Sequence, residues 1–136
     1  MGAVVLDASV LMALVDADDE HHDGAIKAVG RGREAGDRFI VPVAAYAEYM
    51  VRAYERDADR ADFRDRLIEA IPAAVEPATR SIGRQAAALR ARHGSRLRLP
   101  DALIVGTAID LAADRVITAD TRWPDLGIRV DVLEAS

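Results

Sequence analysis

The sequence predicts one α/β domain with a central, mainly parallel sheet flanked by helices. Short apolar runs rich in valine and isoleucine alternate with longer segments of helical periodicity, and this alternation is typical of parallel sheets with helical crossovers. The 136 residues suit a single core, so we assign residues 1–136 to one domain. There is no cysteine, which excludes disulfides, zinc–thiolate sites and thiol nucleophiles.

The first third of the chain contains one predicted strand and two helices. Residues 3–6 are apolar and typical of a buried strand. A short helix over 10–15 follows, and Ser9 is expected to be its N-cap. Periodicity then predicts a helix over 21–33, ended by the turn at Gly36. Its core-facing residues are expected to be Ala25, Ile26 and Val29.

The middle of the chain contains two strands and two helices. Residues 39–41 are predicted to form a buried strand, and Pro42 begins a helix. The apolar residues of that helix are Ala45, Tyr46, Tyr49, Met50 and Ala53. A second amphipathic helix is predicted over 58–71, followed by a short strand over 73–77. The expected apolar face of this second helix is formed by Phe63, Leu67, Ile68 and Ile71.

The last third contains two further helices and two strands. Residues 79–93 are rich in alanine and arginine, which favours a helix stopped by Gly94. A helix is predicted over 100–113, and strands are predicted at 116–117 and 129–133.

Four acidic residues fall at one predicted edge of this sheet. In open α/β sheets, functional sites lie at the carboxyl ends of the strands. Asp7 follows the first strand and Asp120 follows the strand at 116–117. Glu48 lies in the helix that leaves the second strand, and Asp101 begins a helix whose N-terminus lies at the same edge. Four acids from distant parts of the sequence are therefore expected to meet.

Clustered carboxylates indicate a site for a hard divalent cation. Close carboxylates repel one another unless a cation neutralises them, and all-oxygen ligation suits Mg²⁺ or Mn²⁺. Such ions activate water for phosphodiester hydrolysis. Three of the acids also have a structural explanation, because Asp7 could cap a helix, Asp101 could complement a helix dipole and Asp120 could form a turn. A solvated position explains Glu48 less well, because it lies in an otherwise apolar stretch. Their convergence is what favours the metal site.

The charge distribution gives a second indication of function. The net charge is −5, which does not by itself indicate a nucleic-acid-binding protein. Residues 77–100, however, contain no acid and six arginines, of which Arg96 and Arg98 lie nearest the predicted edge. These two are candidates for contacts with RNA phosphates. The alternative is that the arginines pair with the acid-rich segment 55–69.

Four motifs in order along the chain resemble those of PIN domains, closest to VapC-like toxins of bacterial toxin–antitoxin pairs. The motifs are Val4-Val5-Leu6-Asp7-Ala8-Ser9, the single Glu48, Leu99-Pro100-Asp101-Ala102-Leu103-Ile104 and Ile117-Thr118-Ala119-Asp120. The resemblance covers essentially the whole chain. It implies a Rossmann-like sheet and Mg²⁺- or Mn²⁺-dependent cleavage of RNA. It also implies a homodimer and a VapB-like antitoxin that inhibits the enzyme.

The resemblance also assigns residues by position. Asp7, Glu48, Asp101 and Asp120 match the acidic quartet that holds the metal and supports catalysis. The hydroxyl residues Ser9 and Thr118 match supporting positions. His21 and His22 are expected at the surface, and Asp125 is given no firm role.

Other classes fit the sequence less well. A response-regulator receiver needs a lysine after a late strand, but the only lysine is Lys27. A haloacid-dehalogenase-type phosphatase needs an aspartate where Ser9 stands, and the glycine-rich turn of dinucleotide-binding domains is missing. The alternative that stays open is a catalytically silent PIN-fold module that binds RNA or protein. No leader or membrane span is predicted, so a cytoplasmic location is expected.

Overall fold

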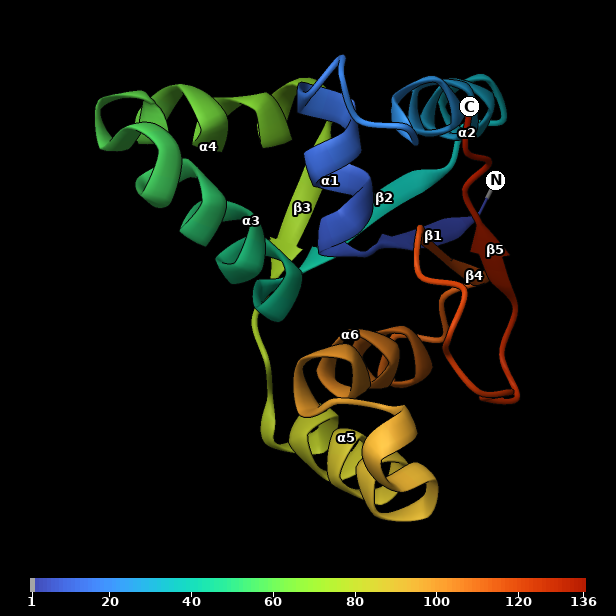
Figure 1. The fold of residues 1–136 in the computed structure, drawn as a ribbon. Coiled ribbons are helices and arrows are strands. Elements are labelled where there is room, and N and C mark those ends of the chain that lie inside the picture. Colours follow the sequence, from blue (N-terminus) through green and yellow to red (C-terminus); the bar gives the residue numbers. More distant parts are fainter. Residues whose placement is uncertain (1) are drawn as a thin grey trace.

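The computed structural model describes residues 2–136 and contains a five-stranded parallel sheet (Figure 1). The strand order is β3-β2-β1-β4-β5, and every neighbouring pair is parallel. The strands are β1 (Ala3–Leu6), β2 (Arg38–Pro42), β3 (Ala73–Glu76), β4 (Arg115–Thr118) and β5 (Val130–Val132). The predicted α/β fold is therefore confirmed.

Helices cover both faces of the sheet. They are α1 (Ala8–Val15), α2 (His22–Glu34), α3 (Val43–Asp57), α4 (Ala61–Ala70), α5 (Arg80–His93) and α6 (Leu99–Asp110). Two short 3₁₀ segments precede α4 and α6, at Ala58–Arg60 and Gly94–Arg96. In Figure 1, α5 and α6 lie below the sheet, and α1 to α4 lie above it.

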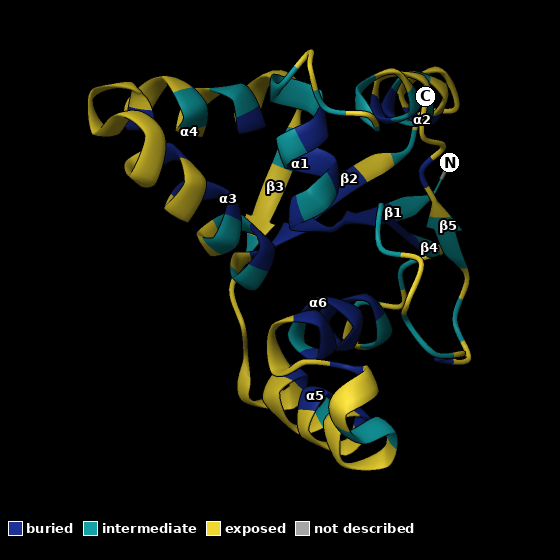
Figure 2. Cartoon of the chain, in the orientation of Figure 1, coloured by how far each residue is buried: buried dark blue, intermediate teal, exposed yellow. Residues whose placement is uncertain are grey.

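The sheet forms the centre of the core. Val4, Val5 and Leu6 of β1 are completely buried, as expected for a central strand with helices on both faces (Figure 2). A second apolar cluster joins α5 and α6 to the loop before β5, through residues such as Leu89, Leu97 and Leu126. This second cluster fixes α6 and thereby places its N-terminus beside the sheet.

The strand order reverses direction between β1 and β4. Leu6 at the end of β1 pairs with Ile117 near the end of β4. From β1 the chain proceeds to β2 and β3 on one side, whereas β4 and β5 lie on the other. This is the switch point at which parallel α/β sheets commonly form their sites. The residues that directly follow β1 and β4 therefore meet there.

Helix α1 begins two residues earlier than predicted, and the prediction of Ser9 as its N-cap was wrong. Asp7 occupies the N-cap position, although its side chain makes no capping hydrogen bond. Ser9 lies within the first turn, where its hydroxyl is directed at Asp7 and not at the helix backbone. Local propensity did not reveal this because the partner of both residues is on β4.

Two side chains predicted to face the core are substantially exposed. Ile26 of α2 is 50% exposed, and Phe63 of α4 is 44% exposed. The helical period is present in both helices, but the neighbouring elements do not extend far enough to cover these positions. Phe63 instead lies beneath the guanidinium of Arg60, 5.5 Å from the ring centroid.

Helix α6 is shorter than predicted. It ends at Asp110, because Ala112 takes a left-handed conformation with φ of 51° and the chain then turns into β4. Strand β5 is likewise shorter than the predicted 129–133. No helix within residues 2–136 is long and apolar enough to span a membrane.

Candidate functional site at the carboxyl edge of the sheet

The predicted acidic residues are carried to one edge of the sheet by four different segments. Asp7 directly follows β1, and Asp120 lies two residues beyond β4. Asp101 is in the first turn of α6, and Glu48 is in α3, which begins immediately after β2. Asp7 is only 5% exposed and Asp101 only 6% exposed. Ordinary surface solvation therefore explains neither residue.

Asp7 is held by two hydroxyl groups. The hydroxyls of Ser9 and Thr118 each donate a hydrogen bond of 2.7 Å to Oδ2 of Asp7. Within residues 2–136 its other oxygen, Oδ1, accepts no hydrogen bond. The carboxylate is thus fixed through one oxygen, while the other is left available to a ligand.

Ser9 and Thr118 also fix the loop that carries Asp120. The Ser9 hydroxyl accepts a hydrogen bond of 3.0 Å from the backbone N–H of Ala119. The Thr118 hydroxyl accepts one of 3.0 Å from the backbone N–H of Asp120. Each hydroxyl therefore links the end of β4 to Asp7, and the two acids that follow β1 and β4 are positioned as one unit.

Asp101 and Glu48 experience the negative charge of their neighbours. Burial raises the pKa of Asp101, and the charges of Asp7 and Asp120 raise it further, although Arg98 lowers it. Burial also raises the pKa of Glu48, again with contributions from Asp7 and Asp101. Burial is the main reason that both groups resist ionisation, and nearby carboxylates add to it.

Asp120 is held by a residue that the sequence analysis did not single out. Burial alone would raise the pKa of Asp120, but hydrogen bonds and charge from Arg122 outweigh this and lower it. Oδ1 of Asp120 accepts a hydrogen bond of 2.8 Å from the backbone N–H of Arg122. Asp120 therefore also stabilises a turn, as its structural explanation predicted. The spacing of Asp and Arg two residues apart, directly after a strand, was the available signal for Arg122.

The donor set fits a hard divalent cation, but it is not assembled as a finished coordination shell. Within the described part of the chain, no three Asp, Glu or His side chains are grouped closely enough to hold an ion as they stand. Asp101 contacts Arg98 and Asp120 contacts Arg122, so arginines engage two of the four acids. All four donors are carboxylates, the preferred ligands of Mg²⁺ and Mn²⁺.

The arginines of α5 and the following turn form an exposed basic surface. All six are exposed, namely Arg80, Arg84, Arg90, Arg92, Arg96 and Arg98. Among the ion pairs of residues 2–136, the only one made by this group joins Arg98 to Asp101. Within the part of the chain that the structure describes, none of the six pairs with an acid of segment 55–69, the alternative considered above. Those acids lie on the α3–α4 side of the sheet, away from α5 (Figure 1).

Other polar residues of interest serve the local structure. Nδ1 of His22 lies 2.6 Å from the carbonyl oxygen of Ala13, and His21 lies beside Asp19. Both histidines are partly buried, not fully at the surface as expected. Asp125 accepts the backbone N–H of Gly127 at 3.0 Å and so stabilises the turn before β5.

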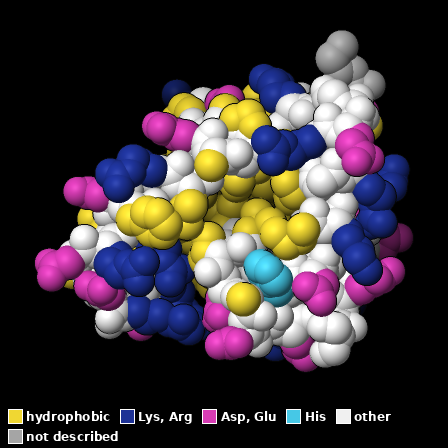
Figure 3. All heavy atoms as spheres, turned by 90° about the horizontal axis from the view of Figure 1, so that it is seen from above, with side chains coloured by type: hydrophobic (Ala, Val, Ile, Leu, Met, Phe, Trp, Pro, Cys, Tyr) yellow, Lys and Arg dark blue, Asp and Glu magenta, His cyan; other side chains and the backbone are white. Residues whose placement is uncertain are grey.

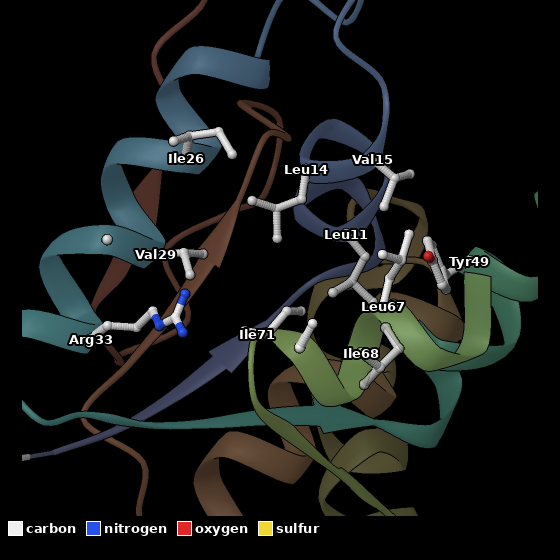
Figure 4. Close-up of a pocket in the computed structure, with 12 residues that line it drawn as sticks. Leu11, Leu14, Val15, Ile26, Val29, Arg33, Tyr49, Leu67, Ile68 and Ile71 are labelled. Atoms are coloured by element: carbon white, nitrogen blue, oxygen red, sulfur yellow. The ribbon is translucent and has the colours of Figure 1, made fainter. Parts of the chain in front are cut away.

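A separate apolar groove opens on the face formed by α1, α2 and α4. Its volume is about 320 Å³. Figure 3 shows this face hollowed and lined by hydrophobic side chains, with charged residues around it. Leu14 of α1, Ile26 and Val29 of α2, and Leu67 of α4 line it, and Arg33 lies at its edge (Figure 4). The groove contains none of the four acids.

The chain matches the family model of the PIN domain over residues 4–128. No curated protein sequence matches it significantly.

Solved structures with the same fold include proteins of toxin–antitoxin pairs. VapBC2 from Rickettsia felis, bound to a promoter DNA fragment, has a TM-score of 0.73 at 10% identity, covering 97% of this chain and 99% of that one. DNA-bound VapBC from Salmonella typhimurium has a TM-score of 0.71 at 17% identity, covering 97% and 98%. VapC20 from Mycobacterium tuberculosis, a toxin that cleaves the sarcin–ricin loop, has a TM-score of 0.66 at 20% identity, covering 83% and 86%.

Proposed function

The chain belongs to the PIN-domain family, and on that premise we propose that it is a Mg²⁺- or Mn²⁺-dependent endoribonuclease, the toxin of a VapBC-type pair. The observation that supports the proposal is that four acidic residues come from segments at one edge of the sheet, with Asp7 and Asp101 almost fully buried. Burial and the charge of Asp7 raise the pKa of Asp101 and of Glu48, so keeping these groups charged destabilises the fold unless a cation neutralises them.

Each residue of the site has a definite task in this proposal. Asp7, Glu48, Asp101 and Asp120 would hold the cation, which when bound activates water and stabilises charge on the phosphodiester. Ser9 and Thr118 orient Asp7 and leave its Oδ1 free. No side chain of the protein is required as a nucleophile, so the two histidines need no part in the reaction.

RNA is the proposed substrate because an exposed basic surface lies beside the acidic edge. Arg98, the N-cap residue of α6, contacts Asp101, and Arg96 ends the 3₁₀ segment two residues before it. Within residues 2–136 Arg96 forms no ion pair and Arg98 forms a single one, with Asp101. Exposed arginines of this kind are suited to phosphate oxygens, which they contact without regard to base sequence. The chain would therefore hold the RNA backbone through Arg96 and Arg98 and present a phosphodiester to the acids.

The proposed protein partner is a VapB-like antitoxin. The apolar groove between α1, α2 and α4 offers a surface for an amphipathic segment of that partner, with Arg33 at its edge to pair with an acidic flank. A second segment carrying an arginine would reach the acidic edge and pair with its carboxylates. Placing a charge in the groove, as in Leu14→Glu, should weaken antitoxin binding without changing RNA cleavage by the free protein.

A homodimer is also proposed, through the exposed apolar ridge of α3. Val43, Val51 and Tyr54 are 38%, 52% and 62% exposed, and their spacing places them on one face of the helix. Glu48 is on the same helix, so a second copy on this ridge would lie close to the acidic edge of the first. An exposed apolar ridge of this kind is typical of an interface.

Cleavage of a radiolabelled RNA with and without Mg²⁺ tests the enzymatic proposal. Activity is expected with Mg²⁺ or Mn²⁺ and not with EDTA. A catalytically silent binding module would bind the RNA equally well in both conditions and cleave it in neither.

A further inference from the structure

Arg122 is attached to Asp120 by three hydrogen bonds. The backbone N–H of Arg122 donates to Oδ1 at 2.8 Å, its Nε donates to the same oxygen at 3.2 Å, and its Nη2 donates to Oδ2 at 3.3 Å. The guanidinium therefore faces both oxygens of this carboxylate. Its side chain is nonetheless 85% exposed, and within residues 2–136 its guanidinium hydrogen-bonds only to Asp120.

Arg98 stands in the same relation to Asp101. Its Nε lies 3.5 Å from Oδ2 of Asp101, and its side chain is 68% exposed whereas that of Asp101 is only 9% exposed. Arg98 also lowers the pKa of Glu48. An exposed guanidinium therefore partly neutralises acids that the fold holds away from solvent.

The other two acids of the site, Asp7 and Glu48, form no ion pair with an arginine within residues 2–136. Asp7 is held only by neutral hydroxyls, and no arginine contacts it among the described residues. Guanidinium groups contact Asp101, which lies beside the basic surface, and Asp120, which lies in the loop after β4. Exposed ion pairs are weak and exchange readily, so these contacts stabilise the acids without closing the site.

We infer that Arg98 and Arg122 are internal counter-ions of the acidic site, which neutralise Asp101 and Asp120 in the metal-free chain and are released when a divalent cation binds there. The inference rests on the proposed function, because it assumes that these acids bind a cation. Once released, both guanidinium groups stand at the acidic edge, where they are free to contact substrate phosphates. The cation and the arginines therefore compete for the same carboxylate oxygens.

Arginine side-chain NMR tests the release directly, without any enzymatic readout. In ¹⁵N-arginine-labelled protein, the Nε–H signal of Arg122 is assigned by its loss in Arg122→Gln, and the protein is then titrated with MgCl₂. The Arg98 and Arg122 signals are expected to move towards the position of a freely solvated arginine. Arg129 is the matched control, because its Nε and Nη2 bond Asp131 at 3.0 and 3.1 Å, two residues away in β5. Its signal should stay in place.

Binding affinity gives a second test. Removing a competing cation should tighten Mn²⁺ binding by RNA-free protein, measured by calorimetry, by up to about fivefold in Arg122→Gln. Arg98→Gln is expected to act in the same direction, whereas Arg129→Gln should leave the affinity unchanged. If wild-type protein binds Mg²⁺ but the Arg122 signal does not move, or if Arg122→Gln and Arg129→Gln bind Mn²⁺ alike, the inference is wrong. If wild-type protein binds neither ion, the proposed metal-dependent function fails with it.

Discussion

The hydroxyl of Thr118 donates a hydrogen bond of 2.7 Å to Oδ2 of Asp7, although 111 residues separate the two along the chain. Thr118 is completely buried at the end of β4, and Asp7 lies at the end of the neighbouring β1. The same hydroxyl accepts the backbone N–H of Asp120. One buried side chain thus links two candidate metal ligands.

This bridge predicts a large effect of Thr118→Val. The substitution keeps the shape but leaves the N–H of Asp120 and one lone pair of Asp7 without their partner. We expect the free energy of unfolding, measured in urea, to fall by about 1 to 3 kcal/mol. Thr118→Ser keeps the hydroxyl and should retain most RNA cleavage, whereas Thr118→Val should not. Equal activity of the two variants would show that the bridge does not position the acids.

Neutralising a buried acid should abolish most of the proposed activity. Asp7→Asn and Asp101→Asn remove charge that would balance the cation, so Mg²⁺-dependent RNA cleavage should fall at least about a hundredfold. Asp125→Asn is the control, because Asp125 is exposed and serves only its own turn. Full activity in both site variants would exclude the proposed mechanism.

The raised pKa of Asp101 predicts how the stability of the folded protein depends on pH. Because burial and the charge of Asp7 raise this pKa in the folded state, the folded protein binds the proton more tightly than the unfolded chain. The resulting stability is present below the ordinary aspartate pKa and is lost as pH rises through the raised value. In EDTA at pH 7, Asp101→Asn should therefore melt at a higher temperature than wild type, and the difference should vanish towards pH 4.

Melting temperatures measured with Mg²⁺ test the same charge argument from the opposite direction. The melting temperature of the wild type should rise at pH 7, because a ligand that binds only the folded state stabilises it, and that of Asp101→Asn should rise less. A wild-type melting temperature already equal to that of the variant in EDTA would contradict the charge argument.

The basic surface predicts a change in salt dependence. Replacing Arg96 and Arg98 together by glutamine should weaken binding of a cleavage-resistant single-stranded RNA of any sequence in Mg²⁺, the condition in which Arg98 is released from Asp101. The slope of log K against log[salt] should fall in magnitude by roughly 0.7 for each lost phosphate contact. Where cleavage occurs should not change, since phosphate contacts do not read bases. Replacing Arg56 and Arg66 on the α3–α4 side is the matched control, and an equal effect there would show that only net charge matters.

The apolar ridge of α3 predicts a dimer. Light scattering at micromolar concentration should give the mass of two chains for the wild type and of one chain for Val51→Asp, because the substitution places a charge on the exposed ridge. Ile26→Asp is the control, since Ile26 is equally exposed but lies on α2. A monomeric wild type would exclude the proposed assembly.

The sequence by itself determined the class of the fold and the approximate place of the acids. Apolar periodicity is a local property, and it predicted each strand and helix to within a few residues. The rule that parallel strands end at one edge then placed Asp7 and Asp120 side by side, because both directly follow strands. No contact between distant side chains was needed for either prediction.

Only the tertiary structure decided which side chains are covered and which groups they bond. The helical period of α2 predicts that Ile26 faces the core, but how far its side chain is covered depends on how far the neighbouring elements extend. Ser9 looked like a helix cap, yet its hydroxyl bonds Asp7, because the end of β4 arrives beside them. Arg98 and Arg122 differ from Ser9, because their acidic partners lie only three and two residues away, within reach of a local sequence signal. Burial and hydrogen-bond partners follow from which segments meet in space, and local sequence does not encode that meeting.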